Sequence, residues 1–452
     1  METALAGITD LCKALMNTSP HPMRLSALIC NRYRAFKERQ RVELAPITII
    51  IGKNGSGKSI FSRLPLLLAA AISENADGPL DISAGGIDHA TSFEDLVNSK
   101  SALPFVLGAE ISNAHTLYRF ESTLRYVSET RALAIENFHL FENDSQIFLA
   151  SISDAEQLQE SAQTFICEYL SKSSRVQLDF IGLFPSLECL DDDIRALIYP
   201  ILSEFRKALP LPSYLGPFRV EPGPSMRSPG QNIRELGPKG EKALEILADD
   251  RLRRNGDLSR KVSDWFRNAM GQEVNIDVTG EQPQVRVGEP GGSFQGNLSD
   301  TGAGFSQCLP YVVQHYAFMA SRLRSPILIV EQPELHLHPA AHGDLADLAI
   351  DSVQSGTDQR ITCIIETHSE EFIMRIRRRL AEGLCKNTAK ILSINHKDSL
   401  EIDSIITTAK AISFDENGNP ESWPAGVFAE ALNDLSLMRR ASRNKKNANS
   451  NS

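Results

Sequence analysis

The sequence predicts an α/β protein with a central sheet covered on both faces, an antiparallel β layer and a helical insertion. Three runs of mostly β-branched apolar residues, 47–51, 327–330 and 361–365, lie far apart in the chain, and polar residues follow each run. Such runs are typical of strands in the middle of a sheet that is buried on both faces. Residues 107–150 alternate apolar and polar side chains, which favours antiparallel strands. Residues 154–210 change to helical spacing and predict the insertion.

Local signals indicate the other elements before the insertion. Residues 1–23 have the character of an extra helical segment that ends in a proline-containing breaker. Short strands are expected at 25–30 and 41–44. A helix is expected at 60–73, because Pro65 falls in its first turns, where proline is tolerated.

The insertion and the segments after it are also marked by composition. Asp191-Asp192-Asp193 is expected to cap a helix N-terminus, where acidic side chains are stabilising, and a metal site there is the less favoured interpretation. A connector rich in proline and glycine covers 212–240. The later elements are helices within 241–270, strands within 273–288, a glycine-rich turn at 289–296 and a helix at 305–321 that Pro310 interrupts.

These elements divide the chain into five segments. They are an N-terminal helical extension (1–23), the first part of the core (24–150), a helical insertion with its connector (151–297), the second part of the core (298–412), and a small C-terminal domain with a basic tail that is expected to be disordered (413–452).

Composition places the chain among ordinary globular proteins. Of its 452 residues, 42% are hydrophobic and 23% are charged, which excludes a fibrous protein and general disorder. Its net charge of 47 minus 57, or −10, argues against general DNA affinity but is compatible with a local basic groove. Seven cysteines without a CxxC pair indicate reduced thiols of an intracellular protein. Because no membrane-spanning run or leader pattern is present, we expect a cytoplasmic protein.

The stretch directly after the first apolar run has the pattern of a phosphate-binding loop. Residues 52–59 fit G-x-x-x-x-G-K-[ST], with a strand before them and a helix after them. Glycines let successive N–H groups turn toward phosphate oxygens, and the helix N-terminus adds its dipole. Lys58 is expected to reach the β- and γ-phosphates and Ser59 to hold Mg²⁺. The predicted nucleotide contacts are Gly52, Lys53, Asn54, Gly55, Ser56, Gly57, Lys58 and Ser59.

Acidic residues follow the second apolar run. Glu331 stands where a Walker B carboxylate holds Mg²⁺ through water. The next residue is Gln332, whose amide cannot accept a proton as a catalytic base does. Either Glu334 serves as the base, or Gln332 orients the water, as glutamine does in some GTPases. Capping of the following helix is the structural alternative for these residues.

Histidines mark two further positions. His368 follows the third apolar run and is a candidate sensor of the γ-phosphate, because it ends a strand expected beside the other two phosphate-site strands. His336 and His338 form a His-Leu-His-Pro stretch. Two histidines without a third ligand are weak evidence for a metal, and a contact between subunits is the favoured role.

A second candidate anion site begins at residue 298. Residues 298–307, the candidate signature segment, open a helix with glycines and hydroxyl groups but carry no lysine. One nucleotide does not need two such cradles in one chain, so this segment is expected to cap the nucleotide of a second copy. A flexible loop with a helix cap is the alternative. The candidate contacts are Ser299, Gly302, Gly304 and Ser306.

Together these motifs resemble the ABC-type ATPase heads of the RecF, SMC and OLD group. The matches are Walker A at 52–59, the candidate signature segment at 298–307, Walker B at 327–332, a D-loop-like stretch at 333–339 and the switch histidine His368, with a large insertion after Walker A. More narrowly, the chain is similar to bacterial AAA-family ATPases that end in a small C-terminal domain of unknown function. Their shared motifs are present here at 331–339, 366–370, 214–219 and 423–426, so that the resemblance covers roughly residues 24–435.

Two segments depart from the family patterns. The candidate signature segment differs from Leu-Ser-Gly-Gly-Gln, so that either Ser299 or Ser306 could touch the partner's γ-phosphate. Phe428-Ala429-Glu430 differs from the expected acidic ending and leaves the role of the C-terminal domain open.

The resemblance implies a P-loop NTPase fold of the ABC-ATPase-head type. It further implies that two copies sandwich two ATP molecules with Mg²⁺, so that ATP binding closes the dimer and hydrolysis reopens it as a conformational switch. Similar proteins act in DNA repair, chromosome maintenance and phage defence, often beside a nuclease. DNA and a separate nuclease or effector subunit are therefore the further partners that the resemblance suggests, without a membrane partner.

The sequence also bears on other functions that a P-loop protein of this kind could have. A nearly non-hydrolysing scaffold, in which Gln332 holds a long-lived closed dimer, is the main alternative. A nuclease within this chain is disfavoured because Asp398, Glu401 and Asp403 form no Asp-x-Asp pair on a strand. A transporter ATPase is disfavoured by the RecF-like motifs. DNA contact would use the basic helix face formed by Arg375, Arg377, Arg378 and Arg379, for which a solvated helix is an equal interpretation.

Overall fold

The computed structural model describes residues 22–159, 163–221, 233–277, 283–292, 295–298, 302–355, 361–398 and 405–422. The expected helical extension at 1–23, except for its last two residues, lies outside the described residues, as do Ser299 and the segments 423–426 and 428–430. Within the part of the chain that is described, no helix is long and apolar enough to cross a membrane.

The central sheet has six strands in the order β12, β16, β17, β3, β18 and β19. Their bounds are Ser213–Leu215, Ile327–Glu331, Thr362–Glu366, Ile47–Gly52, Ala389–Asp398 and Ile405–Ser413. The first five run parallel, and β19 is antiparallel along one edge. The three apolar runs are therefore confirmed as strands, and they lie next to one another. Their carboxyl ends meet at one edge of the sheet, where open parallel sheets bind ligands.

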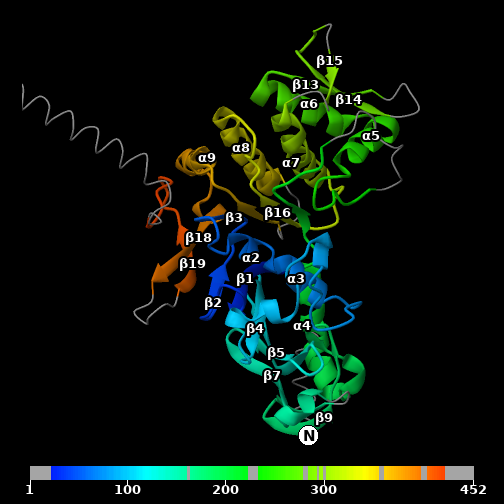
Figure 1. Ribbon diagram of the computed structural model, residues 1–452, viewed down its shortest axis with the longest axis vertical. Helices are drawn as coiled ribbons and strands as arrows, with labels where there is room; N and C mark the ends of the chain where they lie inside the picture. The colour runs from blue at the N-terminus through cyan, green and yellow to red at the C-terminus, as the bar shows by residue number, and fades with distance from the viewer. Residues whose placement is uncertain are drawn as a thin grey trace, which may run out of the picture.

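The two faces of the central sheet are both buried. Ile50 of β3 faces one hydrophobic core, whereas its neighbours Ile49 and Ile51 face another. Figure 1 shows α7, α8 and α9 on one side of the sheet and α2 with α3 on the other. The bounds of these helices are Ala303–Met319, Pro339–Ser355, Glu370–Ala381, Lys58–Ser62 and Leu64–Ala71. Because successive side chains of a strand point to opposite faces, a strand covered on both sides is apolar throughout.

An eight-stranded antiparallel sheet forms the second layer, in the order β2, β1, β4, β5, β6, β7, β8 and β9. Their bounds are Gln40–Glu43, Arg24–Asn31, Phe105–Ser112, Leu117–Val127, Ala132–Glu142, Ser145–Ile152, Thr164–Tyr169 and Lys172–Gln177. The predicted antiparallel strands are confirmed. The prediction of helical structure is wrong for 164–177, where β8 and β9 continue the sheet. There Phe165, Cys167 and Tyr169 are buried with the period of two that a strand requires.

A long helix packs against this antiparallel sheet. Helix α4 spans Asp192–Ala208 and follows the small hairpin of β10 (Phe180–Ile181) and β11 (Phe184–Pro185). The capping interpretation of the acidic triplet is confirmed, because an Asp191 side-chain oxygen accepts a hydrogen bond from the Ile194 backbone N–H at 3.0 Å. Phe205 of α4 packs edge-on against Phe120 of β5, with ring centroids 5.0 Å apart.

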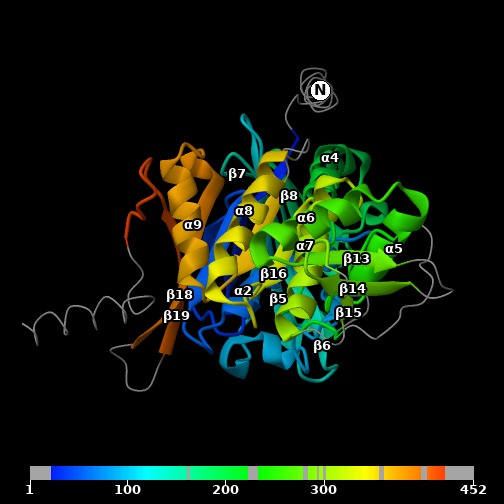
Figure 2. The same ribbon diagram turned by 90° about the horizontal axis from the view of Figure 1, so that it is seen from above.

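The remaining helices cover the end of the central sheet near α7. Helices α5 (Ala243–Arg253) and α6 (Asp257–Met270) precede a three-stranded sheet of β13 (Glu273–Asp277), β14 (Gln284–Gly288) and β15 (Gln295–Asn297). The two helices and the first two strands were predicted, whereas β15 begins within the segment expected to be a turn. Figure 2 shows this unit beside α7. Two helix predictions are corrected in detail. The helix expected at 60–73 is divided at Arg63, with Pro65 in the first turn of α3, and α7 continues through Pro310.

Candidate nucleotide-binding site

The glycine-rich loop joins β3 to α2 at the carboxyl edge of the central sheet. Gly55 and Gly57 have φ angles of 77° and 96°, in the left-handed region where glycine carries no steric penalty. A Cβ atom on Gly52 would lie 2.4 Å from the carbonyl oxygen of Ile394 on the neighbouring strand β18. Glycine is therefore favoured at positions 55 and 57 by the backbone conformation. At position 52 it is favoured because strand β18 passes too close for a side chain.

Lys58 is folded into the loop that it follows. Its ammonium group donates hydrogen bonds to the carbonyl oxygens of Gly52 at 3.1 Å and Lys53 at 2.9 Å. Burial lowers the pKa of Lys58, and the nearby carboxylate of Glu366 opposes this shift. The Lys58 ammonium group therefore lies within the loop, where it can bind the anionic oxygens of a phosphate group.

The loop also contains an unsatisfied hydroxyl group. The Ser56 Oγ atom is buried and has no hydrogen-bond partner in the described part of the chain. A buried hydroxyl without a partner costs free energy, which a phosphate oxygen bound in the loop would recover. The composition and geometry of this loop thus fit the phosphate groups of a nucleotide.

Two glutamates meet beside the loop, at the ends of β16 and β17. Glu331 and Glu366 are directly paired in the parallel register of these strands. The Ser59 hydroxyl donates to Glu366 at 2.9 Å, and the Ser62 hydroxyl donates to Glu331 at 3.1 Å. Arg63 binds both oxygens of Glu331 at 2.7 Å each. The predicted metal ligands Ser59 and Glu331 are therefore neighbours, but the carboxylate that Ser59 contacts directly is Glu366.

The electrostatics of the pair are asymmetric. Burial raises the pKa of Glu366 to about 7, repulsion by Glu331 adds to the rise, and the Ser59 hydrogen bond and Lys58 oppose it. Glu331 has the Arg63 guanidinium as its own counter-ion. The donor set of two carboxylates and a serine hydroxyl is the oxygen-rich chemistry that Mg²⁺ prefers, so the residues present fit this ion.

The residues after Walker B turn toward the switch histidine. Glu334 accepts a hydrogen bond from the His368 backbone N–H at 2.7 Å with one carboxylate oxygen, and its other oxygen is buried without a partner among the described residues. Gln332 has a positive φ of 47°, and its N–H donates to the carbonyl oxygen of Glu366 at 2.7 Å. Partial burial lowers the pKa of His368, and Lys58 adds to this effect. The structure thus brings Gln332, Glu334 and His368 to the same edge as the loop.

Residues 47–375 match the protein-family model described as "AAA domain, putative AbiEii toxin, Type IV TA system". This chain belongs to that family. The match confirms the AAA-family resemblance. The family and the sheet topology together make the fold a mixed α/β P-loop NTPase with a parallel core sheet and an added antiparallel layer.

Two solved structures are similar to this AAA-family chain over most of its length. The SMC head bound to the C-winged helix domain of ScpA has a TM-score of 0.42 and 11% identity, covering 86% of this chain and 98% of that chain. The SMC head domain from Thermotoga maritima has a TM-score of 0.41 and 11% identity with the same coverage. No curated protein matches the chain.

The candidate signature segment lies at the start of α7 in this AAA-family chain. Gly304 is packed so closely that an added Cβ would lie 2.8 Å from the carbonyl oxygen of His336 in the D-loop-like stretch. Ser306 is buried, and Gly302 is exposed directly before the helix. Among these three residues, Gly302 is exposed, Gly304 is partly exposed and Ser306 is buried. Ser299 lies outside the described residues.

The histidine-containing stretch forms no metal site with the residues described. His336 and His338 are exposed, and no cluster of three or more potential metal ligands occurs within the described ranges. His342, in the first turn of α8, has ring nitrogens 2.9 Å from the Ser369 hydroxyl and 3.3 Å from the Leu337 carbonyl oxygen. It therefore joins the D-loop-like stretch to the segment of the switch histidine.

The basic face of α9 is occupied by contacts within the chain. Arg375 pairs with Asp347 and Asp344 of α8, and Arg379 makes two hydrogen bonds to Asp347. Arg378 pairs with Glu382, and Arg377 donates to the carbonyl oxygen of Gly418. These guanidinium groups are therefore paired with carboxylate or carbonyl groups of the same chain, and DNA contact through this face stays a prediction.

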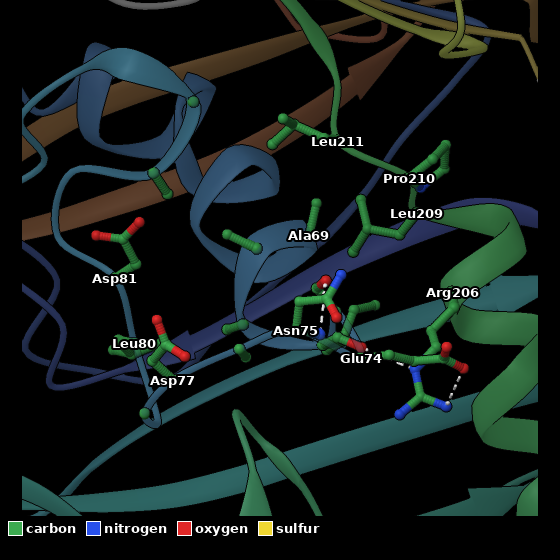
Figure 3. A pocket seen from close by; sticks show the side chains of 18 of the residues that line it. Ala69, Glu74, Asn75, Asp77, Leu80, Asp81, Arg206, Leu209, Pro210 and Leu211 are labelled. Carbon is green, nitrogen blue, oxygen red and sulfur yellow. Dashed lines mark hydrogen bonds and ion pairs between the residues drawn. The ribbon is translucent and has the colours of Figure 1, made fainter.

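A separate cavity lies away from the phosphate loop. It has a volume of about 880 Å³, and none of residues 52–59 line it. Figure 3 shows Arg206 of α4 pointing toward Glu74 at its rim, while Leu209 and Leu211 lie on the same side. The Arg206 Nε atom donates to the carbonyl oxygen of Ile72 at 2.9 Å. This arginine thus serves to join α4 to the end of α3, and it is remote from the site.

Sequence reasoning missed three residues of the site. Glu366 lies within the recognised motif at 366–370 and Arg63 within the helix expected at 60–73, but neither was assigned a role from the sequence. An acidic residue at the end of the strand beside the phosphate loop was a visible signal for Glu366. Arg219 was noted only as part of the 214–219 motif, and its contacts with the Walker B strand connect segments more than a hundred residues apart.

Proposed function

We propose that this chain is an Mg²⁺-dependent ATPase that uses ATP binding and hydrolysis as a conformational switch. The observation that carries the proposal is the hydrogen bond between Ser59 of the phosphate loop and Glu366, beside Glu331 at the end of the Walker B strand. This contact brings the loop's metal-binding hydroxyl to a pair of carboxylates. A bound Mg²⁺ supplies neutralisation of the charge on the β- and γ-phosphate oxygens.

Each residue then has a defined role. The loop N–H groups of 52–59 and the Lys58 ammonium hold the phosphates, and Ser59, Glu331 and Glu366 hold the metal. We place Glu334 and Gln332 next to the γ-phosphate, at the carboxyl edge of the central sheet. We assign proton acceptance to Glu334, because its second oxygen is buried without a partner in the described structure and an amide cannot accept a proton. Gln332 orients the water, and His368 contacts the γ-phosphate.

The switch itself requires a second copy. We propose that two chains dimerise around ATP, with Gly302 and the start of α7 of one copy facing the γ-phosphate in the other. The closed state gains contacts to the γ-phosphate that are lost on hydrolysis, which is the differential interaction that a switch requires. The family description names a type IV toxin–antitoxin system. This supports a role in defence with a partner effector over DNA repair, and DNA is the other candidate partner.

ATP turnover of the purified protein tests the proposal. Wild type should hydrolyse ATP with Mg²⁺, and Lys58→Ala should lose both nucleotide binding and turnover. Glu334→Gln should keep binding but lose at least tenfold in kcat, because the variant lacks the proton acceptor. If Glu334→Gln retains full kcat, the assignment of Glu334 is wrong. If wild type and Lys58→Ala bind ATP equally, the nucleotide site itself is refuted.

The alternative is a nucleotide-dependent scaffold with very slow turnover. It is favoured by Gln332, which occupies the position where many related ATPases have a glutamate. Its signature would be an ATP-dependent dimer, seen by light scattering, that persists for hours in wild type without release of phosphate. Fast turnover in wild type excludes it.

A further inference from the structure

Arg219 lies at a junction between the candidate signature segment and the Walker B strand. Its side chain is 5% exposed. The Nη1 atom donates to the carbonyl oxygen of Gln307 at 3.1 Å, and Nη2 donates to the carbonyl oxygens of Glu331 at 3.0 Å and Gln332 at 3.3 Å. One guanidinium group therefore binds the first turns of α7 and the two residues that end Walker B.

The backbone of the same residue strengthens the contact with α7. The Arg219 N–H donates to the Gln307 side-chain oxygen at 3.2 Å, and the Gln307 amide nitrogen donates back to the Arg219 carbonyl oxygen at 3.2 Å. Gln307 is itself 8% exposed. Arg219 and Gln307 are thus joined by three hydrogen bonds, so that a displacement of α7 would carry the guanidinium with it.

A buried cation is a costly way to bridge carbonyl groups. Burial lowers the pKa of Arg219 to about 10, which leaves it protonated at neutral pH. Its hydrogen bonds that the structure describes go to uncharged groups, and its Nε atom has no partner there. A neutral amide could bridge carbonyl groups without the desolvation penalty of a charge. A planar group with donors spread over three nitrogens can, however, hold several carbonyl groups in one fixed geometry.

The peptide that Arg219 holds is conformationally unusual. Gln332 has a φ of 47°, which costs free energy for a residue other than glycine, and its N–H is bound to β17. Such a peptide keeps its conformation only when the surrounding contacts fix it. Arg219 donates a hydrogen bond to the Gln332 carbonyl oxygen. Because Arg219 is also bound to Gln307, a movement of α7 would change the position of the Gln332 peptide and its side chain.

We propose that Arg219 is a positioning residue that couples α7 to the Gln332 peptide, so that engagement of the candidate signature segment sets the geometry of the hydrolytic water. This inference rests on the proposed ATPase function. It states that Arg219 acts through Gln332 and makes no contact with the nucleotide. Its removal should therefore affect kcat and leave KM and nucleotide affinity unchanged.

The test compares two variants with a matched control. Arg219→Lys keeps the positive charge but loses the planar set of guanidinium N–H donors. Gln307→Met removes the side-chain hydrogen bonds between Gln307 and Arg219 without removing the arginine. Arg206→Lys is the control, because Arg206 is another arginine that binds a backbone carbonyl but is remote from the site. Each protein is measured for affinity to a fluorescent ATP analogue, for kcat and KM, and for hydrogen exchange of the backbone N–H groups in 331–335, among which Pro333 has none.

We expect both variants to bind the analogue within threefold of wild type and to lose at least tenfold in kcat with KM unchanged, while the control keeps wild-type kcat. A folded Gln307→Met or Arg219→Lys protein with kcat within twofold of wild type would overturn the inference. If Arg219→Lys does not fold, Gln307→Met decides. If wild type has no turnover, the ATPase proposal fails, and hydrogen exchange decides the coupling. Gln307→Met must then still accelerate exchange at 331–335, and unchanged exchange refutes the coupling.

Discussion

Replacing Arg63 by methionine should destabilise the protein strongly, because it leaves a buried charge without its partner. Arg63 makes two 2.7 Å hydrogen bonds to Glu331, whose side chain is 2% exposed. The variant would place the Glu331 carboxylate beside Glu366 with no counter-ion. Methionine keeps much of the aliphatic stem, so lost packing contributes little.

The magnitude follows from burial. Removal of one partner of a buried ion pair costs about 3–5 kcal/mol. The Arg63 side chain is 28% exposed, so water can reach part of the pair, and we expect about 2–4 kcal/mol. Arg39→Met is the control, because Arg39 makes a comparable 2.7 Å pair with Glu121 but is 48% exposed. Exposed pairs contribute about 0–1 kcal/mol.

The assay is urea unfolding followed by circular dichroism, arranged as a double-mutant cycle with Glu331→Gln. The double variant should lose less stability than the sum of the single variants by at least about 1 kcal/mol, since neutralising Glu331 removes the unpaired charge. The Arg63→Met defect should also shrink as pH falls from 8 to 6, because one of the two facing glutamates then takes up a proton. Additive effects, or an Arg63→Met protein within 0.5 kcal/mol of wild type, would refute the reasoning.

Three other predictions concern stability and binding. Burial lowers the pKa of His315 to about 3 against an ordinary value of 6.5, so its contribution to stability is present above pH 6.5 and is lost as pH falls toward 3. Between pH 7.5 and 5 wild type should therefore lose about 2 kcal/mol more than His315→Gln in urea unfolding. Gly52→Ala should lose at least tenfold in affinity for a fluorescent ATP analogue, because its Cβ would collide with the Ile394 carbonyl oxygen. Asp191→Ala should lower stability by about 1 kcal/mol through loss of the helix cap, whereas Asp192→Ala, with a side chain 97% exposed, should be neutral in thermal unfolding.

The central sheet and its loop could be predicted from sequence because their signals are local. The run 47–51 carries a β-branched residue at every position, and residues 52–59 follow it directly, so the strand, the loop and the helix are encoded side by side. Burial on both faces then requires the same residues that propensity favours. Local and tertiary requirements agree at this place, and the prediction holds.

The secondary-structure prediction was wrong where the hydrophobic pattern of the sequence was weak. Residues 164–177 combine a short alternating strand with a polar edge strand, and most of the side chains of β9 remain exposed. An exposed edge strand has little hydrophobic pattern, so its pairing with β8 decides its conformation. The pairing of Arg375 and Arg379 with carboxylates of α8 was likewise not predicted, because the partners come from another segment.

The contacts of the site itself depend on strand order, which no local pattern specifies. Sequence spacing associates Ser59 with Glu331, because both belong to recognised motifs. In the sheet, however, β17 lies between β16 and β3, so the residue next to the loop at this edge is Glu366. The carboxylate on the intermediate strand is nearer to the loop than the Walker B carboxylate is. A prediction of the metal site thus needs the topology as well as the motifs.

This strand order also suggests how the metal can enter without disrupting the fold. Glu331 is neutralised by Arg63, and a metal that used Glu331 alone would have to compete with a buried pair of hydrogen bonds. Glu366 has no arginine partner among the described residues, and its raised pKa of about 7 reflects burial beside Glu331. A divalent cation near Ser59 would favour the ionised form of Glu366 and leave the Arg63–Glu331 pair intact. Arg63 and Arg219 thus fix the end of the Walker B strand, and in the proposed metal site Glu366 is the carboxylate beside Glu331 that has no arginine partner among the described residues.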